Sequence, residues 1–186
     1  LVAGGPARNV PIKGDGMRFR LAEPSDAPML AAISIEVWLG TYIRRGVSDA
    51  FATYALTQFT PARLAAVIGD PDEHVIVSQN DDGPDAFIRI SSGKAAPVAG
   101  CSTTEISTLY VQPRHQGRGL GRALLHQGLD HAAGKGAGSV WLTTNAENAP
   151  AIAFYQGNRF DRVGTTAFRI ADQAYPNAVF SRATAR

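Results

Sequence analysis

The chain of 186 residues has the length of one ordinary domain, and its hydrophobic fraction of 45% suits a chain that buries a sizeable core. The formal net charge is only +2 and the basic residues are scattered, which disfavours a nucleic acid as the partner. Cys101 is the single cysteine, which excludes an intramolecular disulfide and fits a reducing, cytoplasmic compartment. No apolar run approaches the length of a membrane span, so no membrane partner is expected.

The first sixteen residues differ in composition from the rest of the chain. They contain four glycines and two prolines, and no apolar run of the kind found in a signal peptide. We expect residues 1–16 to form a flexible N-terminal segment, native or vector-derived. Residues 17–186 show no internal repeat and no composition break, and are expected to form a single domain.

The first half of the domain predicts one strand, two helical regions and a β-hairpin. Ser25 is expected to cap the first helix, and Gly40 to interrupt it. Pro61 is expected to interrupt the second helical region. Alternation and turn residues place these elements at 17–21 (strand), 25–40 and 48–68 (helical), and 74–78 and 86–90 (hairpin).

The second half begins with a strand over residues 105–111. Strict alternation would place Ile106, Thr108 and Tyr110 on one side of it, and Leu109 and Val111 on the other. The remaining elements are expected to be a helix to about residue 134, a strand at 140–144, a helix at 149–156, and strands at 160–170 and 178–183.

The order of these elements predicts the fold class. A strand–helix–strand unit over 105–144 implies a parallel pair with a right-handed crossover, whereas the hairpins imply antiparallel pairs. We therefore expect an α/β (α+β) fold with a mixed, mostly antiparallel sheet of six or seven strands, flanked by about four helices.

A glycine-rich loop separates the 105–111 strand from the next helix. Gly117, Gly119 and Gly121 stand at alternate positions, and an apolar stripe at helical spacing starts at Leu120. Free amide groups at a helix N-terminus, together with the helix dipole, suit an anion such as phosphate. The loop therefore predicts a phosphate-binding site.

Three interpretations of this loop compete. A nucleotide-binding P-loop requires Gly-Lys-Ser or Gly-Lys-Thr, which the chain lacks. A dinucleotide fingerprint requires G-x-G-x-x-G and an acidic residue about twenty residues on, whereas this loop reads G-x-G-x-G and the next strand ends in Thr143-Thr144. A plain solvent loop would leave the arginines and the helix start at this place as coincidence.

Two motifs resemble the GNAT superfamily of acyl-CoA-dependent N-acetyltransferases. Residues 116–121, QGRGLG, match the family's Q/R-x-x-G-x-G/A motif, and residues 109–113 match the strand and turn that precede it. Residues 148–155, NAPAIAFY, resemble its N-x-x-A-x-x-F-Y helix. One departure is that Arg159-Phe160 stands where the family usually has Gly-Phe, and we expect Asn158 to supply the left-handed residue at that helix end.

The resemblance implies a fold and a cofactor. It implies that strands 105–111 and 140–144 are parallel but splayed, so that the arm of acetyl-CoA binds between them as a surrogate strand. No metal is implied. The residues that it assigns to the cofactor are Leu109, Tyr110, Val111, Gln116, Gly117, Arg118, Gly119, Leu120, Gly121, Arg122, Asn148 and Phe154.

The implied reaction is transfer of the acetyl group to a primary amine by direct attack on the thioester. Tyr155 matches the family's general acid by position, and Glu105 is our candidate for the base that deprotonates the amine. Trp38 and Tyr42 lie where the family binds the acceptor and are candidate substrate contacts. The implied partner is an amine on a small molecule, peptide or protein, and exposed terminal strands leave a homodimer possible.

Two other functions stay open from the sequence. A noncatalytic acyl-CoA-binding or sensory module would use the same fold without turnover. A nucleotide-cofactor enzyme is the weaker alternative, because the loop fits both nucleotide motifs poorly.

Overall fold

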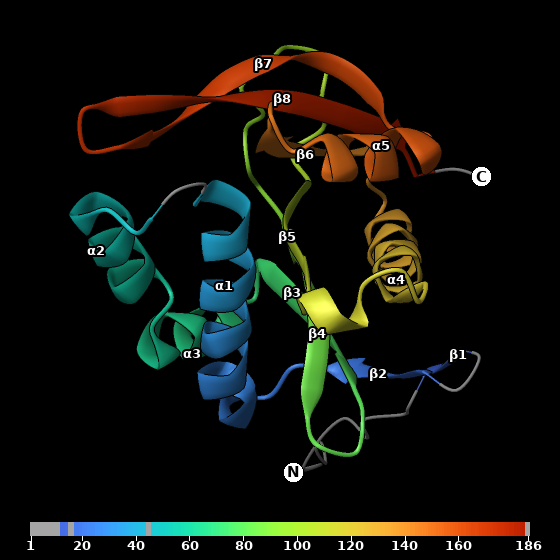
Figure 1. Ribbon diagram of the computed structural model, residues 1–186. Coiled ribbons are helices and arrows are strands. Elements are labelled where there is room, and N and C mark those ends of the chain that lie inside the picture. Colours follow the sequence, from blue (N-terminus) through green and yellow to red (C-terminus); the bar gives the residue numbers. More distant parts are fainter. Residues whose placement is uncertain (1–11, 15–16, 44–45, 185–186) are drawn as a thin grey trace, which may run out of the picture.

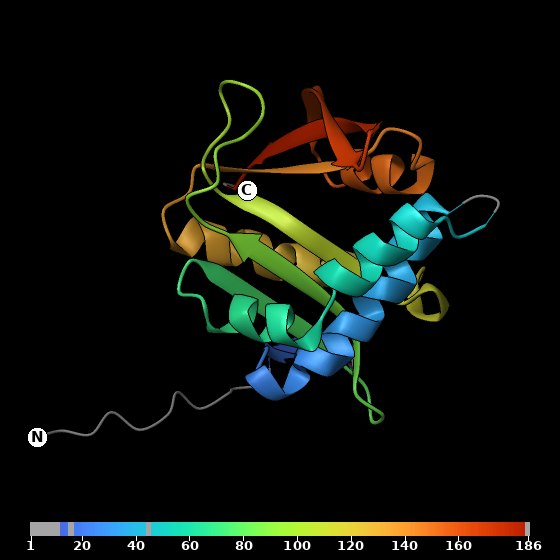
Figure 2. The ribbon, with the colours of Figure 1, turned by 90° about the vertical axis from the view of Figure 1, so that its left-hand side faces the viewer.

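The computed structural model describes residues 12–14, for which only the backbone is considered, and residues 17–43 and 46–184. Within these ranges the chain forms one mixed sheet with helices on both faces (Figures 1 and 2). Its strands are β1 (Ile12–Gly14), β2 (Met17–Leu21), β3 (Glu73–Gln79), β4 (Pro84–Ser91), β5 (Glu105–Val111), β6 (Ser139–Asn145), β7 (Asp161–Ile170) and β8 (Gln173–Ala183). Its α-helices are α1 (Ala27–Tyr42), α2 (Asp49–Gln58), α3 (Pro61–Gly69), α4 (Leu120–Gly134) and α5 (Ala149–Gly157).

The strands run in the spatial order β1-β2-β3-β4-β5-β6-β8-β7. All neighbours pair antiparallel except β5 and β6, which are parallel. This confirms the predicted fold class. The eighth strand is the short β1, which lies inside the segment 1–16 that was expected to be flexible; the rest of that segment lies outside the described residues.

Two apolar layers sandwich the sheet. On one face α4 covers the larger core, in which Ile88, Leu124 and Phe180 are fully buried. On the other face α1 and α3 cover a smaller cluster around Leu30 and Phe87. Figure 1 shows α1, α2 and α3 on one side of the sheet and α4 on the other, with the long β7–β8 hairpin lying across the end of the molecule near α2.

The first helix corrects two predictions from the sequence. Its entry is held by Asp26, which accepts the backbone N–H of Glu23 at 2.8 Å and pairs with Arg20 at 2.6 Å, whereas Ser25 is exposed. Asp26 takes this role because its carboxylate accepts the free backbone N–H of Glu23 and also pairs with the partly buried Arg20 cation. The helix also continues through Gly40 to Tyr42, since Tyr42 packs into an aromatic cluster that favours the extra turn.

The alternation predicted for β5 is wrong at one residue. The register steps from Arg89↔Thr108 to Ile90↔Ile106, so Ser107 is the extra residue of a β-bulge. A bulge places two successive side chains on one face and reverses the alternation beyond it. Ile106 therefore joins Leu109 and Val111 in the core under α4, while Tyr110 packs toward α1.

Candidate active site

The parallel strands β5 and β6 separate almost as soon as they meet. Glu105 and Trp141 are their one registered pair, and the Trp141 N–H donates to the Thr104 carbonyl at 3.0 Å. On its other edge β6 pairs with β8 along its whole length, from Ser139 to Asn145. Beyond Trp141, β6 has no registered partner in β5. The backbone of β5 from residue 107 onward thus has an open edge facing the gap, and an extended ligand can add to such an edge as an extra strand.

The glycine loop lies at the far end of that open edge. Gly117 and Gly119 have φ angles of +74° and +87°, a region that disfavours residues with a Cβ, and Gly119 caps the N-terminus of α4. Gly117 and Gly119 are exposed, as are the flanking Arg118 and Arg122. The loop therefore offers amide donors, a helix dipole and two cations to an anion, as the sequence predicts.

Other loop residues have structural roles that the motif did not predict. The Gln116 side chain donates to the Val111 carbonyl at 3.1 Å and ties the loop back to β5. Gly121 lies against Phe154 and Val111, where an added Cβ would make ordinary contacts at 3.6 Å, which agrees with the glycine or alanine of the motif. Leu120 is buried beneath the loop.

The helix α5 positions Tyr155 and Phe154. Asn148 accepts the Ala151 N–H at 3.2 Å and so caps this helix, as predicted. Tyr155 is 9% exposed, and burial raises the pKa of its phenol above the ordinary value. A protonated phenol can donate a proton, which is the role that the sequence resemblance implies for Tyr155.

The end of α5 corrects the expectation about Asn158. That residue has a φ of −102°, and its side chain donates to the Phe154 carbonyl at 2.7 Å. Arg159 instead adopts the left-handed conformation, with a φ of +63°. The backbone geometry expected of a glycine at this position is thus kept by an arginine.

Glu105 lies at the closed end of the gap, half-buried, and Ser107 donates to its Oε2 at 2.9 Å. Burial raises the pKa of the Glu105 carboxyl, which the Ser107 hydrogen bond and the charges of Arg89 and Lys94 partly oppose. A raised pKa moves a carboxylate toward the range suited to a general base at neutral pH.

The two predicted substrate contacts differ in their surroundings. Trp38 is only 4% exposed and lies at the centre of an aromatic cluster built by α1, α2 and β7. Its ring stacks on that of Tyr54, with the two ring centroids 4.8 Å apart. Its main role is packing. Tyr42 is half-buried in the same cluster, and burial raises the pKa of its phenol while the amides of Asn177 and Asn145 oppose that rise.

Sequence reasoning missed Asn145 and Asn177. They are a registered pair on β6 and β8, and each is 7% exposed. The Asn177 Oδ1 atom is buried without a hydrogen-bond partner in the described part of the chain. No motif marks them, because only the pairing of two strands distant in sequence brings them beside Tyr42.

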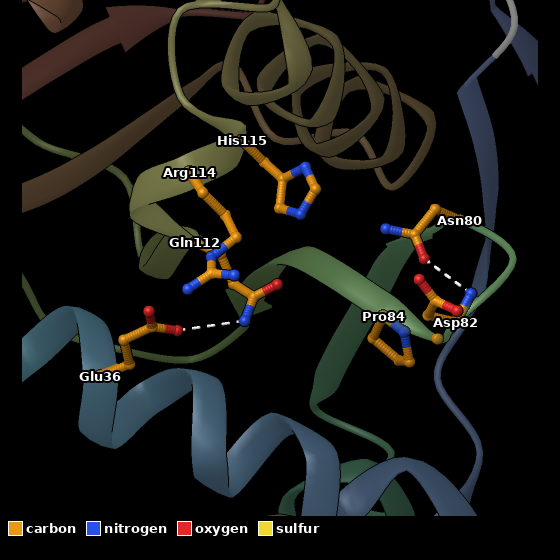
Figure 3. Close-up of a pocket in the computed structure, with 8 residues that line it drawn as sticks. Glu36, Asn80, Asp82, Pro84, Gln112, Arg114 and His115 are labelled. Carbon is orange, nitrogen blue, oxygen red and sulfur yellow. Dashed lines mark hydrogen bonds between the residues drawn. The ribbon is translucent and has the colours of Figure 1, made fainter.

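An open polar cavity of about 650 Å³ lies next to the glycine loop (Figure 3). In it Gln112 donates to Glu36 of α1 at 3.0 Å, and Arg114 and His115 extend from the segment just before the loop. None of the predicted site residues lines this cavity. Its full lining is Glu36, Asn80, Asp82, Gly83, Pro84, Gln112, Arg114 and His115.

Other kinds of site find no support within the described ranges. No group of three or more His, Cys, Asp or Glu side chains there is placed to hold a metal ion. Nor is any helix in that part of the chain long and apolar enough to cross a membrane.

The single registered pair between β5 and β6 and the glycine loop at the start of α4 are the features that the sequence resemblance predicts for an acyl-CoA-dependent transferase. The model of the Acetyltransferase (GNAT) family matches residues 41–159, and the chain belongs to this family of acetyl-CoA-dependent N-acetyltransferases.

Similar proteins agree with this assignment. An uncharacterised N-acetyltransferase of Mycobacterium tuberculosis is 29% identical over 78% of this chain and 90% of its own length. A streptothricin acetyltransferase of Streptomyces lavendulae is 30% identical over 77% of this chain and 80% of its own. The PaiA N-acetyltransferase of Thermoplasma acidophilum, solved in complex with coenzyme A, has the same fold, with a TM-score of 0.69 at 17% identity over 90% of this chain and 99% of its own.

Proposed function

We propose that this enzyme transfers the acetyl group of acetyl-CoA to a primary amine by direct attack on the thioester, with Glu105 as the base and Tyr155 as the acid. The observation that carries the proposal is the single registered pair between β5 and β6. It leaves a gap with Glu105 at its closed end, the glycine loop beyond its open edge and the Tyr155 helix beside it.

The glycine loop fits the pyrophosphate of the cofactor. Amides of residues 116–122 would hold it, helped by Arg118 and Arg122, and the open edge of β5 near Tyr110 and Val111 would bind the arm. Acetyl-CoA supplies an activated acyl group. The β5 amides supply hydrogen bonds to the oxyanion that develops on its carbonyl.

Glu105 would start the reaction. An alkylamine has a pKa of about 10.4 and arrives mostly as the ammonium ion, so the Glu105 carboxylate takes its proton, directly or through water. The freed nitrogen forms the C–N bond as the C–S bond breaks, and its surplus proton leaves to solvent.

Tyr155 would then protonate the leaving thiolate. The burial that raises the pKa of its phenol also raises the proton affinity of a thiolate in the same site, so donor and acceptor stay matched. The phenolate regains a proton from solvent before the next cycle.

Tyr42 and Asn177 support an acceptor site on the α1 side of the gap. The buried Asn177 Oδ1 atom is a hydrogen-bond acceptor without a donor in the described part of the chain, and an amine N–H would supply that donor. The aromatic rings around Tyr42 suit the apolar part of an acceptor or a second cationic group. The resemblance to a streptothricin acetyltransferase supports a small-molecule amine as the first class to test.

The test is a panel of amines incubated with the purified protein and acetyl-CoA. The panel contains streptothricin, aliphatic monoamines and polyamines, amino acids, and peptides with different N-termini. Release of free CoA thiol, together with the mass of an acetylated product, identifies the acceptor. Saturable acetyl-CoA binding without transfer to any amine would overturn the proposal in favour of a noncatalytic module.

A further inference from the structure

A chain of hydrogen-bonding side chains leads from Glu105 away from the gap, across three neighbouring strands. The Ser107 hydroxyl lies 2.9 Å from Glu105 Oε2, and its Oγ lies 2.5 Å from the Oγ of Ser91 on β4. The Ser91 hydroxyl lies 2.5 Å from Glu73 Oε2 on β3. Each link is within the range of an O–H···O hydrogen bond.

The strand registers produce this alignment. Glu105 pairs with Ser91, and Ser91 pairs with Glu73, so the three residues stand side by side across the sheet. The bulge at Ser107 adds a hydroxyl that links Glu105 to Ser91. Ser91 is fully buried and the Glu73 side chain is only 3% exposed, so water does not replace these links.

A count of protons shows that the chain is incomplete when both glutamates are ionised. Three contacts join the four side chains, but only the two serine hydroxyls carry a proton that can fill them. One contact therefore lacks a hydrogen. Adding one proton at Glu105 fills all three, with each group donating to the next and Glu73 accepting at the end.

The far end of the chain is a carboxylate paired with two cations. Arg89 donates to Glu73 twice, with Nε at 2.7 Å from Oε2 and Nη2 at 2.5 Å from Oε1. Lys94 lies 3.9 Å from the same carboxylate and is half-exposed. Because both cations contact Glu73 directly, the added proton is held at the Glu105 end. The charged groups that act on Glu105 are these two cations, which lower its pKa, and Glu73, which raises it.

We infer that Ser107, Ser91 and Glu73 are positioning residues that prepare Glu105 to accept the proton of the acceptor amine, because their chain of hydrogen bonds is complete only when Glu105 carries that proton. The proton passes from the ammonium nitrogen to Glu105, which then donates to Ser107. This inference rests on the proposed function for the assignment of Glu105 as the base.

The substitution Ser91→Ala tests the chain. Without the Ser91 hydroxyl, Ser107 donates only to ionised Glu105, so the ionised form gains relative to the protonated one. We expect the pKa of Glu105 to fall by roughly half to one unit, the size expected for one lost hydrogen bond. The low-pH limb of the plot of kcat/KM against pH should shift to lower pH by the same amount.

A second readout does not depend on turnover. Infrared spectra of the free protein, with the carboxylic-acid C=O band of Glu105 assigned by its loss in Glu105→Gln, give the protonation midpoint directly. That midpoint should be lower in Ser91→Ala and unchanged in Ser92→Ala, whose side chain is exposed one residue away. Ser91→Cys, similar in volume but a weak donor, should give an intermediate midpoint if Ser91→Ala does not fold.

The outcomes separate the chain from the proposed function. An unchanged infrared midpoint in Ser91→Ala and Ser91→Cys would overturn the chain, whatever the kinetics. Full activity in Glu105→Gln would instead remove Glu105 as the base, while the infrared midpoint would still report whether the chain tunes that carboxyl.

Discussion

Tyr155 is the residue on which the proposed chemistry most directly depends. Its ring packs against Phe154, Phe160 and Phe180, with centroids 5.3 to 6.2 Å away. These contacts fix the ring, and burial raises the pKa of the phenol. The packing will remain in a variant that loses only the hydroxyl, so the role of the proton can be measured separately from that of the ring.

The substitution Tyr155→Phe should lower kcat by roughly ten- to a thousandfold, the usual range for loss of an acid catalyst. The affinity for acetyl-CoA should stay nearly the same, because the ring is kept. Steady-state kinetics measures the change in kcat, and calorimetric titration measures the affinity for acetyl-CoA. An unchanged kcat, with chemistry rate-limiting, would remove Tyr155 from the mechanism.

Arg159 stores backbone strain at the end of α5. A non-glycine residue with a φ of +63° costs roughly 1 kcal/mol relative to glycine. Arg159→Gly should therefore raise the free energy of unfolding by about 0.5–1 kcal/mol, whereas Arg159→Ala keeps the strain and should not. Denaturant unfolding of both variants measures this, and equal stability of the two would contradict it.

At the scale of elements, α4 is held against the sheet by a close approach at Gly128. A Cβ at this position would lie 2.8 Å from the Ile88 Cδ1 atom and 3.2 Å from that of Ile90. Both isoleucines are buried in the core, where side chains are close-packed. Because the glycine loop begins this helix, the same contact positions the N-terminus that we propose to bind the cofactor.

The substitution Gly128→Ala should lower the free energy of unfolding by roughly 1–3 kcal/mol, the usual cost of overpacking a core. Gly134→Ala in the same helix meets no atom within 4 Å and should be neutral or slightly stabilising. Thermal unfolding of the pair separates steric overlap from helix propensity. If Gly128→Ala were as stable as Gly134→Ala, the side chains of Ile88 and Ile90 would be able to make room for the added methyl group, and the prediction would be wrong.

At the scale of the whole molecule, the proposed site depends on the divergence of the two parts of the sheet. The β1–β5 part and the β6, β8, β7 part meet through one registered pair, Glu105 with Trp141 (Figure 1). A ligand that bridges the gap contacts both parts. We therefore expect acetyl-CoA to stabilise the fold as well as to react in it.

Gly119→Glu should abolish this stabilisation. The new side chain adds bulk and negative charge at the helix N-terminus, and strains a residue whose φ is +87°. The matched control is Gly138→Glu, because a Cβ added at Gly138 meets no atom within 4 Å and this glycine lies beyond the other end of α4. Acetyl-CoA should raise the melting temperature of the unsubstituted protein and of Gly138→Glu, but not that of Gly119→Glu. A normal thermal shift in folded Gly119→Glu would place the phosphates elsewhere.

Local patterns determined much of this protein. The element order, the glycine loop and the Asn148 cap follow from periodicity and turn chemistry, which act over a few residues. The family could be inferred from short motifs for the same reason, since an anion site at a helix start uses neighbouring amides.

The tertiary structure alone decided which distant residues meet. The bulge at Ser107 reversed the faces of β5, because its position depends on the register with β4 and not on the alternation within the strand. The same register joins Glu105 to Ser91 and Glu73, and the β6–β8 pairing brings Asn177 to Tyr42. The glycine loop could be predicted from the sequence because it is built from neighbouring residues. The surroundings of the proposed base and acceptor site could not, because they depend on strand pairing, which long-range packing decides.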